Sequence, residues 1–209
     1  MTTAQRTTYR HGDLRQALVD AGVEMARSEG PDAVVLREAT RRAGVSPNAA
    51  YRHFADRTAL VEAVSDACLG YAASAIEIEW EAIDPSLGAS ERARAELRAV
   101  GTGYLRFARD EPGLFLAAFT VPRHLQAALS PRKAGPGGRT PFELLGVALD
   151  DLVAAGELPP ERRQGAELVA WSAVHGLAML ILQGPLRDLP ADLARVVAEQ
   201  VLDMADRGI

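Results

Sequence analysis

A short stretch of the sequence, SPNAAYRHF, carries polar side chains at a spacing that suits contact with DNA. Ala50 and Phe54 lie four residues apart, so on a helix they share one face and would pack inward. The remaining side chains would then point outward, as on a DNA-binding helix that enters the major groove. This outward face consists of Asn48, Ala49, Arg52 and His53.

The surrounding segment, Leu36 to Phe54, predicts two helices joined by a tight turn that would position this face. The helical pattern from Leu36 to Ala43 is interrupted at Gly44, since glycine readily adopts the positive φ that a sharp turn needs. Ser46 is a favourable N-cap for the second helix, and Pro47 fits its first position. The pattern indicates a helix-turn-helix. The alternative that it leaves open is an ordinary helical hairpin within a bundle.

The distribution of charge favours a chain in which only the N-terminal part binds DNA. The net charge is −5, which by itself is unusual for a DNA-binding protein. Residues 1–60 hold nine arginines against seven acidic residues, whereas residues 61–209 hold 14 basic and 21 acidic residues. A basic N-terminal part on an acidic body is consistent with a phosphate-binding unit joined to a part that does not touch DNA.

The composition favours a soluble all-α protein. Hydrophobic residues make up 48% of the chain, enough for a sizeable core, and runs of β-branched residues are rare. The single cysteine, Cys68, excludes a disulfide framework and a multi-cysteine zinc site. The sequence has no apolar run of transmembrane length, and its N-terminus has no apolar signal segment. We therefore expect a cytoplasmic protein without a membrane partner.

Two longer motifs, YRHGDLRQALVDAG and LREATRRAGVSPNAAYRHFADRTALVEAV, resemble the N-terminal DNA-binding domain of the tetracycline-repressor (TetR) family. The resemblance covers about residues 9–64, and its most specific parts are the AGVS turn and the YRHF end of the second helix. It implies an all-α fold with a three-helix DNA-binding domain and an N-terminal arm at residues 1–57. A larger helical domain for ligand binding and dimerisation would follow at residues 58–209, and double-stranded operator DNA would be a partner.

The resemblance also implies a role for each residue that matches the family's motif. Asn48, Ala49 and Arg52 occupy positions that face base edges, where asparagine suits adenine, alanine the thymine methyl group and arginine guanine. For Arg41 and Arg42 we expect only a solvated helix face. Contacts with the phosphate backbone are implied for Arg37, Ser46, Tyr51, His53 and Arg57.

One position departs from the family's pattern. The residue before the first helix of the motif is usually a serine or threonine that caps the helix and contacts phosphate, and here it is Val35. A valine side chain can do neither, although Asp32 is available as a substitute cap. We expect a loss of about 1 kcal/mol of helix stability and weaker DNA binding.

The remainder of the chain predicts further helices, about nine in all. A long helix is expected from Asp56 to about Ile83, and a late one from about Glu161 to Gln183. Thr140 followed by Pro141 and by Glu143 indicates a capping box that starts another helix. Residues 130–141 are rich in proline and glycine and predict a mobile surface loop.

The last two long helices are predicted to form a homodimer interface. The segment WSAVHGLAMLILQG, which starts at Trp171, is apolar nearly all round and must be buried on several sides. Its Trp171, His175 and Gly176 resemble a Trp–His–Gly signature of one subgroup of the family. In the family the last two helices pair with their twofold mates, which implies the same role for this segment and for the helix expected over Asp192–Arg207.

The family usually binds a small effector in its C-terminal domain and then releases DNA. For each candidate pocket residue of this chain, the alternative is ordinary core packing. His175 stands out because a polar side chain on an apolar helix needs a partner, although a satisfied core or interface histidine remains the alternative. The apparent lack of basic residues near these positions predicts a small, neutral, apolar effector. The candidates are Trp80, Tyr104, Phe107, Phe115, Phe119, Trp171, His175 and Met179.

The sequence contains no motif that indicates an enzyme. The patterns G-x-S-x-G, H-E-x-x-H and G-x-G-x-x-G are absent, and the four histidines are scattered at no metal-ligand spacing, so we expect no catalysis, cofactor or metal. The favoured function is a ligand-responsive repressor that acts as a homodimer on a palindromic operator. Two alternatives stay open: a constitutive repressor or an activator without an effector, and a helical ligand-binding or scaffold protein that has lost DNA binding.

Overall fold

The computed structural model describes residues 11–121 and 124–208, and the expected N-terminal arm therefore lies almost entirely outside the described residues. Within them the chain is helical and has no strand, as the sequence predicts. Three short 3-10 helices also occur, η1 (Pro31–Ala33), η2 (Leu125–Leu129) and η3 (Pro131–Lys133). The α-helices are α1 (His11–Glu29), α2 (Leu36–Arg42), α3 (Pro47–Ala50), α4 (Arg57–Glu81), α5 (Ala89–Asp110), α6 (Pro112–Ala118), α7 (Pro141–Ala154), α8 (Pro160–Arg163), α9 (Ala166–Leu182) and α10 (Ala191–Gly208).

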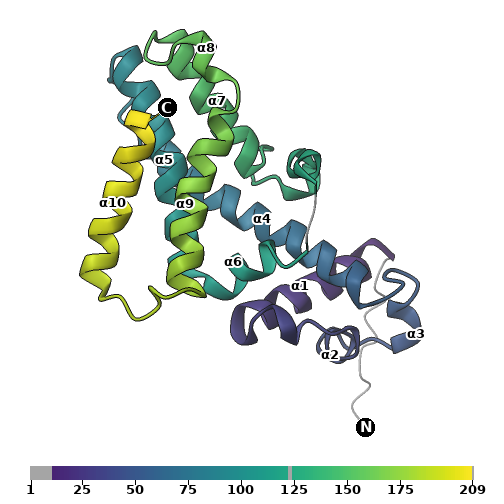
Figure 1. Ribbon diagram of the computed structural model, residues 1–209. Coiled ribbons are helices and arrows are strands. Elements are labelled where there is room, and N and C mark those ends of the chain that lie inside the picture. The colour runs from purple at the N-terminus through teal and green to yellow at the C-terminus, as the bar shows by residue number, and fades with distance from the viewer. Residues whose placement is uncertain (1–10, 122–123, 209) are drawn as a thin grey trace.

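The helices form a small head and a larger body that are joined by α4 (Figure 1). We call α1, η1, α2 and α3 the head, and α5 to α10 the body. In the head, Leu18, Val34 and Phe54 are almost fully buried and pack with Leu60 and Val64 of α4. The same apolar cluster continues into the body as far as α10. One apolar cluster is therefore shared by head and body, and a second cluster lies within the body, between α4, α5, α7 and α9.

The long helix α4 begins at the head and ends deep in the body. The side chain of Asp56 caps it by accepting a hydrogen bond from the backbone N–H of Ala59 at 2.8 Å. By length and composition alone α4 could span a membrane, but half of its most apolar stretch is buried by other helices of this chain. The buried apolar residues of α4 thus belong to the core, and the helix contacts α1, α5, α6 and α7. The helix starts at Arg57, where the sequence places the boundary between the DNA-binding domain and the larger domain. It therefore contributes to both the head and the body.

A second contact between head and body is made by α6 on α1, and the two helices lie next to each other in Figure 1. Gly113 of α6 sits so close to the end of α1 that a Cβ atom there would overlap the backbone oxygen of Ala26. Beside this contact, Nε of Arg27 lies 3.0 Å from a carboxylate oxygen of Glu111. The Ser65 hydroxyl of α4 donates to the carbonyl of Ala118 at 2.8 Å, which fixes the other end of α6.

One expectation about the body is wrong. The helix predicted over Glu161–Gln183 is divided into α8 and α9, because Gly165 adopts a φ of +81° that an α-helix cannot continue through. The described residues therefore hold ten α-helices, one more than the approximate number expected. Residues 130–141 lie largely at the surface, as expected, but they are anchored on the body, since Lys133 is only 3% exposed and the N–H of Gly137 donates to Glu77 of α4 at 3.1 Å.

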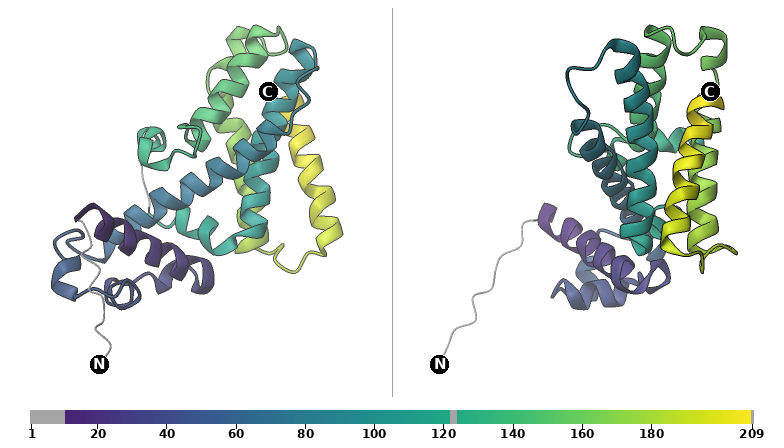
Figure 2. Two further views of the ribbon diagram at one scale, coloured as in Figure 1. Left: turned by 180° about the vertical axis from the view of Figure 1, so that it is seen from behind. Right: turned by 90° about the vertical axis from the view of Figure 1, so that its left-hand side faces the viewer.

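Local signals in the sequence locate the start of α7 correctly. The hydroxyl of Thr140 accepts from the N–H of Glu143 at 3.2 Å, and the Glu143 side chain accepts from the N–H of Thr140 at 2.8 Å. This is the capping box that the sequence predicts. Figure 2 shows the resulting body from two further directions, with α9 and α10 side by side at its edge.

The contact at Gly113 makes a testable prediction. Gly113→Ala should lower the free energy of unfolding by about 1–3 kcal/mol, because the added methyl group meets rigid backbone. Gly146→Ala in α7 is the matched control, since the nearest atoms to its new methyl group are 3.9 Å away or more. The control should be neutral or stabilising by up to about 1 kcal/mol. Chemical denaturation measures both, and equal effects would contradict the assigned contact.

Candidate DNA-binding surface and ligand cavity

The second helix of the helix-turn-helix begins where the sequence predicts. Ser46 is its N-cap, and the Ser46 hydroxyl accepts from the N–H of Ala49 at 3.4 Å. The regular helix α3 is only four residues long, but its backbone bonding continues to Phe54, whose N–H donates to Ala50 at 2.9 Å. Ala50 and Phe54 are buried on the head core, as expected from their spacing. The opposite face is therefore turned outward.

The residues expected on this outward face are accessible. Tyr51 is 58% exposed, and Ser46, Asn48 and Arg52 are also exposed. Ala49 and His53 are half-buried. Among the described residues, the Arg52 guanidinium makes no hydrogen bond or ion pair, so its donors are available to a ligand.

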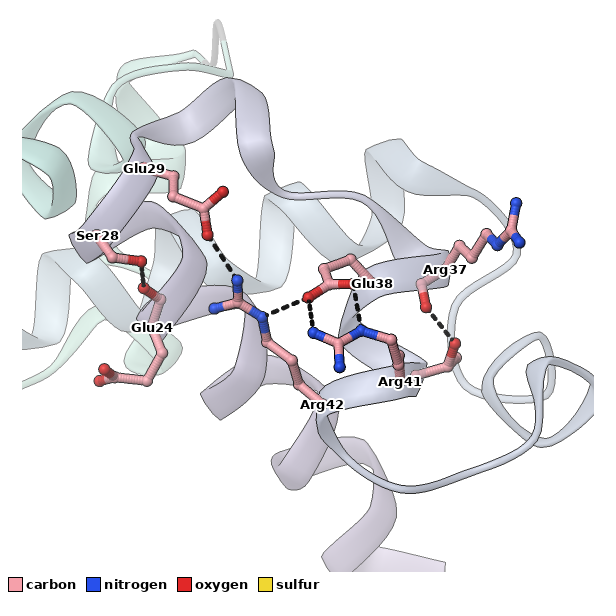
Figure 3. A network of polar contacts seen from close by, with 8 residues as sticks. Glu24, Ser28, Glu29, Arg37, Glu38, Arg41 and Arg42 are labelled. Carbon is pink, nitrogen blue, oxygen red and sulfur yellow. Dashed lines mark hydrogen bonds and ion pairs between the residues drawn. The ribbon is translucent and has the colours of Figure 1, made fainter.

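The first helix of the motif carries three arginines that differ in their pairing (Figure 3). Arg41 and Arg42 both donate to the carboxylate of Glu38, at distances of 2.6–2.8 Å. Arg42 also donates to Glu29 at 2.6 Å. These hydrogen bonds lower the pKa of Glu38 to about 2. The Arg37 side chain points away from this network and has no charged partner among the described residues.

Arg57 has a structural role that the sequence does not reveal. Its guanidinium donates to the backbone oxygens of Val34 at 2.8 Å and of Asp32 at 3.2 Å, just before α2. Val35 is the N-cap of α2 and offers no side-chain hydrogen bond, as its residue type dictates. Asp32 does not cap α2 either, because it lies within η1. The start of α2 is thus held by Arg57 rather than by a capping side chain.

The body contains a cavity of about 340 Å³, which lies between α4, α5, α9, α10 and parts of the segments 118–121 and 124–145. Its size falls within the range of small-molecule sites in proteins. Four of the eight pocket residues expected from the sequence line it: Tyr104, Phe119, Trp171 and His175. The other four do not line it: Trp80, Phe107, Phe115 and Met179 pack in or against the apolar core.

The four lining residues are joined by ring contacts and by a short chain of hydrogen bonds. Nε1 of Trp171 donates to the hydroxyl of Tyr104 at 3.2 Å, and this hydroxyl lies 2.9 Å from Nδ1 of His175. The ring of Phe119 packs on His175 with centroids 4.6 Å apart. Burial lowers the pKa of His175 and raises that of Tyr104, so both side chains are neutral near pH 7. His175 is therefore a partnered histidine that also faces the cavity.

The cavity also contains charged residues that the sequence interpretation missed. Arg98 and Lys133 both line it, which contradicts the expectation that no basic residue lies near the pocket. The signal was present in the glycine-rich segment around Lys133, but only the fold shows that this segment turns inward onto α4. Lys133 donates through Nζ to the backbone oxygen of Ala127. Arg98 lies 2.7 Å from Asp203 of α10 and also pairs with Glu199.

Other chemistry finds little support in the described part of the chain. Residues 11–121 and 124–208 contain no group of three or more side chains that could hold a metal ion. Cys68 is fully buried, and burial raises the pKa of its thiol to about 12, so the reactive thiolate is strongly disfavoured. It serves as a small apolar core residue.

Large apolar side chains remain exposed on the outer faces of α9 and α10. The two helices pack against each other but leave these side chains uncovered. Several large exposed apolar side chains on two neighbouring helices are typical of a protein interface. The exposed residues are Leu168, Val169 and Leu180 on α9, and Leu193, Val196 and Met204 on α10.

Two sequence models of protein families match the chain. The model described as "Bacterial regulatory proteins, tetR family" matches residues 18–64, which include the helix-turn-helix. The model described as "Tetracyclin repressor-like, C-terminal domain" matches residues 97–204, which is more than half of the chain. No curated protein matches the sequence. The Trp–His–Gly subgroup is not addressed by these matches and stays a prediction.

Several solved structures are similar to this chain. A protein of unknown function from Rhodococcus sp. RHA1 has a TM-score of 0.71 and 27% identity, covering 98% of this chain and 99% of that one. RolR, solved with its ligand resorcinol, has a TM-score of 0.62 and 16% identity over 93% and 88% of the two chains. A TetR family regulator from Marinobacter aquaeolei VT8 has a TM-score of 0.58 and 18% identity over 91% and 94%. The last two show a shared fold alone.

The uncapped start of α2 makes a second prediction. The backbone of Val35, with φ −128° and ψ 139°, already has the extended conformation that an N-cap residue needs. Val35→Thr should therefore raise the free energy of unfolding by about 1 kcal/mol, because its hydroxyl can accept a free N–H of the first turn. Val35→Ala is the control and should gain nothing. Urea denaturation of the three proteins checks this, and equal stability of the threonine and alanine variants would refute the capping argument.

Proposed function

The chain belongs to the tetracycline-repressor family of DNA-binding transcription regulators, and we propose that it is a ligand-responsive repressor that binds a palindromic operator as a homodimer. We assign DNA binding to residues 1–57, and ligand binding and dimerisation to residues 58–209. Regulators of this family are not enzymes, and the site of action would be the cytoplasm. The observation that carries the proposal is a cavity whose wall includes the end of α6, the helix that packs on the head.

The exposed face of α3 supports direct reading of base edges in the major groove. Arg52 and Asn48 are exposed and suited to bidentate hydrogen bonds with guanine and adenine, while Ala49 can contact a thymine methyl group. Contacts with the phosphate backbone would come from Ser46, Tyr51, His53 and Arg37. Arg57 is the weakest assignment for phosphate binding, because its guanidinium already holds the backbone before α2.

Substitutions at Arg52 and Tyr51 should separate base reading from backbone binding. Arg52→Ala should cost about 1–3 kcal/mol on the preferred operator and relax the preference at one base pair. Tyr51→Phe should weaken binding to all operator variants alike, by about threefold to tenfold, since a phosphate bond carries no sequence information. Arg41→Ala, whose arginine is paired with Glu38, serves as a surface-charge control and should change affinity least.

These effects can be measured by fluorescence anisotropy at one fixed salt concentration, after selection of an operator from random DNA. Wild-type-like preference in Arg52→Ala would refute the base-contact assignment. A sequence-dependent loss in Tyr51→Phe would move Tyr51 into the base-reading set. Failure of the wild-type chain to select any sequence would refute the proposed repressor itself.

The exposed apolar faces of α9 and α10 support a homodimer through these two helices. Val169 is 58% exposed and Met204 is 59% exposed, values that are costly for large apolar residues gathered on one surface. A twofold axis at this surface would pair α9 and α10 with the same helices of a second copy. The two heads would then sit about 34–36 Å apart, one turn of DNA, on a near-palindromic site.

Charge placed on this surface should separate the subunits. Val169→Glu and Met204→Glu should each convert the dimer to a monomer at micromolar concentration, because a carboxylate would be buried without a partner. Ile78→Glu on α4 is the matched control, since Ile78 is 54% exposed but lies on another helix. Sedimentation velocity reports the outcome, and a dimer that survives both charged substitutions would exclude this interface.

Ligand responsiveness is supported by the contacts between cavity and head. Ala118 and Phe119 at the end of α6 line the cavity, while Gly113 and Glu111 at its start contact the end of α1. A ligand that favours one position of α6 would therefore shift the population of head positions. In a dimer, that shift would change the distance between the two recognition helices and release the operator.

A further inference from the structure

The hydrogen bonds around His175 fix which of its ring nitrogens carries the proton. An indole N–H can only donate, so the bond from Trp171 makes the Tyr104 oxygen an acceptor. Among the described residues, Nδ1 of His175, 2.9 Å away, is the only acceptor within hydrogen-bond distance of the Tyr104 hydroxyl, so the hydroxyl proton is donated there. A neutral imidazole that accepts at Nδ1 must carry its proton at Nε2. The three side chains thus form a directional chain that ends in an N–H group at Nε2.

This terminal N–H is open to the cavity. His175 lines the cavity, and no residue in the described part of the chain hydrogen-bonds to its Nε2 atom. Among the described residues, every fully buried side-chain nitrogen or oxygen has a hydrogen-bond partner. Because Nε2 has none, it is not fully buried. The surroundings of the ring are aromatic, with Phe119 at 4.6 Å and Trp171 at 5.4 Å between ring centroids. A ligand at this place would meet a single hydrogen-bond donor surrounded by apolar walls.

The charged side chains of the cavity wall do not supply a free hydrogen-bond acceptor that would compete for this N–H. Lys133 carries only donors, and its ammonium group is anchored on the Ala127 carbonyl. Arg98 is likewise a donor and is neutralised by acids of α10. The one carboxylate in the wall, Asp206, lies 3.1 Å from Arg94 and is therefore paired. Apart from the exposed His124, the charged and polar side chains of the wall therefore offer hydrogen-bond donors rather than free acceptors.

We propose that the effector of this cavity is a largely apolar molecule with an acceptor oxygen, a carbonyl or a carboxylate, that binds the Nε2–H of His175. Tyr104 and Trp171 are positioning residues, because they set the tautomer without needing to touch the acceptor. This inference rests on the proposed function in taking the cavity as the effector site. It replaces the expectation of a purely apolar effector with a defined polar group and a defined partner.

Matched naphthalene probes test whether the cavity prefers a ligand that carries an acceptor oxygen. The ketone 2-acetylnaphthalene and the hydrocarbon 2-isopropenylnaphthalene have nearly the same shape, but only the ketone has an acceptor oxygen. Calorimetry on the full-length protein should show about threefold to tenfold tighter binding of the ketone. Equal affinity, tighter binding of the hydrocarbon, or no binding of any probe would overturn the proposal. The cation 2-(aminomethyl)naphthalene, which carries donors only, should bind more weakly than the ketone, and the reverse order would also overturn it.

The charge of the acceptor is settled by one more probe, 2-naphthoate. Tighter binding than the ketone would identify a carboxylate ligand, and weaker binding would identify a neutral carbonyl ligand. Both results agree with an acceptor at His175 as long as the probe loses affinity when that residue is changed.

Substitutions assign the effect to His175. His175→Phe keeps a ring but removes both nitrogens, and it should reduce the difference between ketone and hydrocarbon to less than about twofold. His124→Phe is the matched control, because His124 also lines the cavity but is exposed and outside the chain of hydrogen bonds. The control should keep the wild-type preference. Loss of the preference at His124 but not at His175 would overturn the assignment.

A measurement without ligand checks the tautomer directly. Long-range ¹H–¹⁵N correlation spectra of the imidazole rings should show His175 protonated at Nε2, and Tyr104→Phe should shift the ring toward the other tautomer. A wild-type ring protonated at Nδ1 would overturn the proposal whether or not a probe binds. Operator binding is measured separately on the same samples. Loss of probe discrimination with intact operator binding would count against this inference alone, whereas a chain that binds probes but no DNA would count against the repressor.

Discussion

The close approach of α6 to α1 is the contact on which the arrangement of head and body depends. A glycine at position 113 allows the two backbones to meet, and the pair of Arg27 with Glu111 closes the contact at its edge. Without it, only α4 would connect the head to the body, and a single helix leaves the head free to bend about its end. With it, the head is attached at two places, and under the proposed function a displacement of α6 would reorient the whole head. The cavity lies at the other end of this same short helix.

Local chemistry in the sequence was sufficient to predict where three of the helices begin. Ser46, Asp56 and Thr140 each start a helix because a side-chain oxygen reaches a free N–H only a few residues ahead. Such capping signals depend only on residues close in the sequence, so they can be identified without knowledge of the fold. The inward packing of Ala50 and Phe54 follows from their spacing for the same reason. The local structure of the helix-turn-helix is therefore the part of the protein that the sequence predicts best.

The cavity could be predicted only in part, because its wall depends on contacts between distant segments. Half of the side chains expected at a pocket line the cavity, whereas the other half pack in or against the core instead. Nothing near Lys133 in the sequence shows that it turns inward, since its burial depends on Glu77 of α4 holding the following glycines. The role of Arg57 was missed for a related reason, as its acceptors are backbone oxygens that any residue could supply.

The apolar character of α4 has a consequence during synthesis of the chain, before folding is complete. Its contacts with α5, α6 and α7 are all made by segments that follow it in the sequence. During synthesis, a 25-residue helix with the composition of a membrane span is therefore complete while most of its covering surface has not yet been made. Until α5 to α7 emerge from the ribosome, an apolar surface of this kind is open to aggregation and to chaperones. The helix that joins head and body in the folded protein thus depends on later segments of the chain for most of its cover.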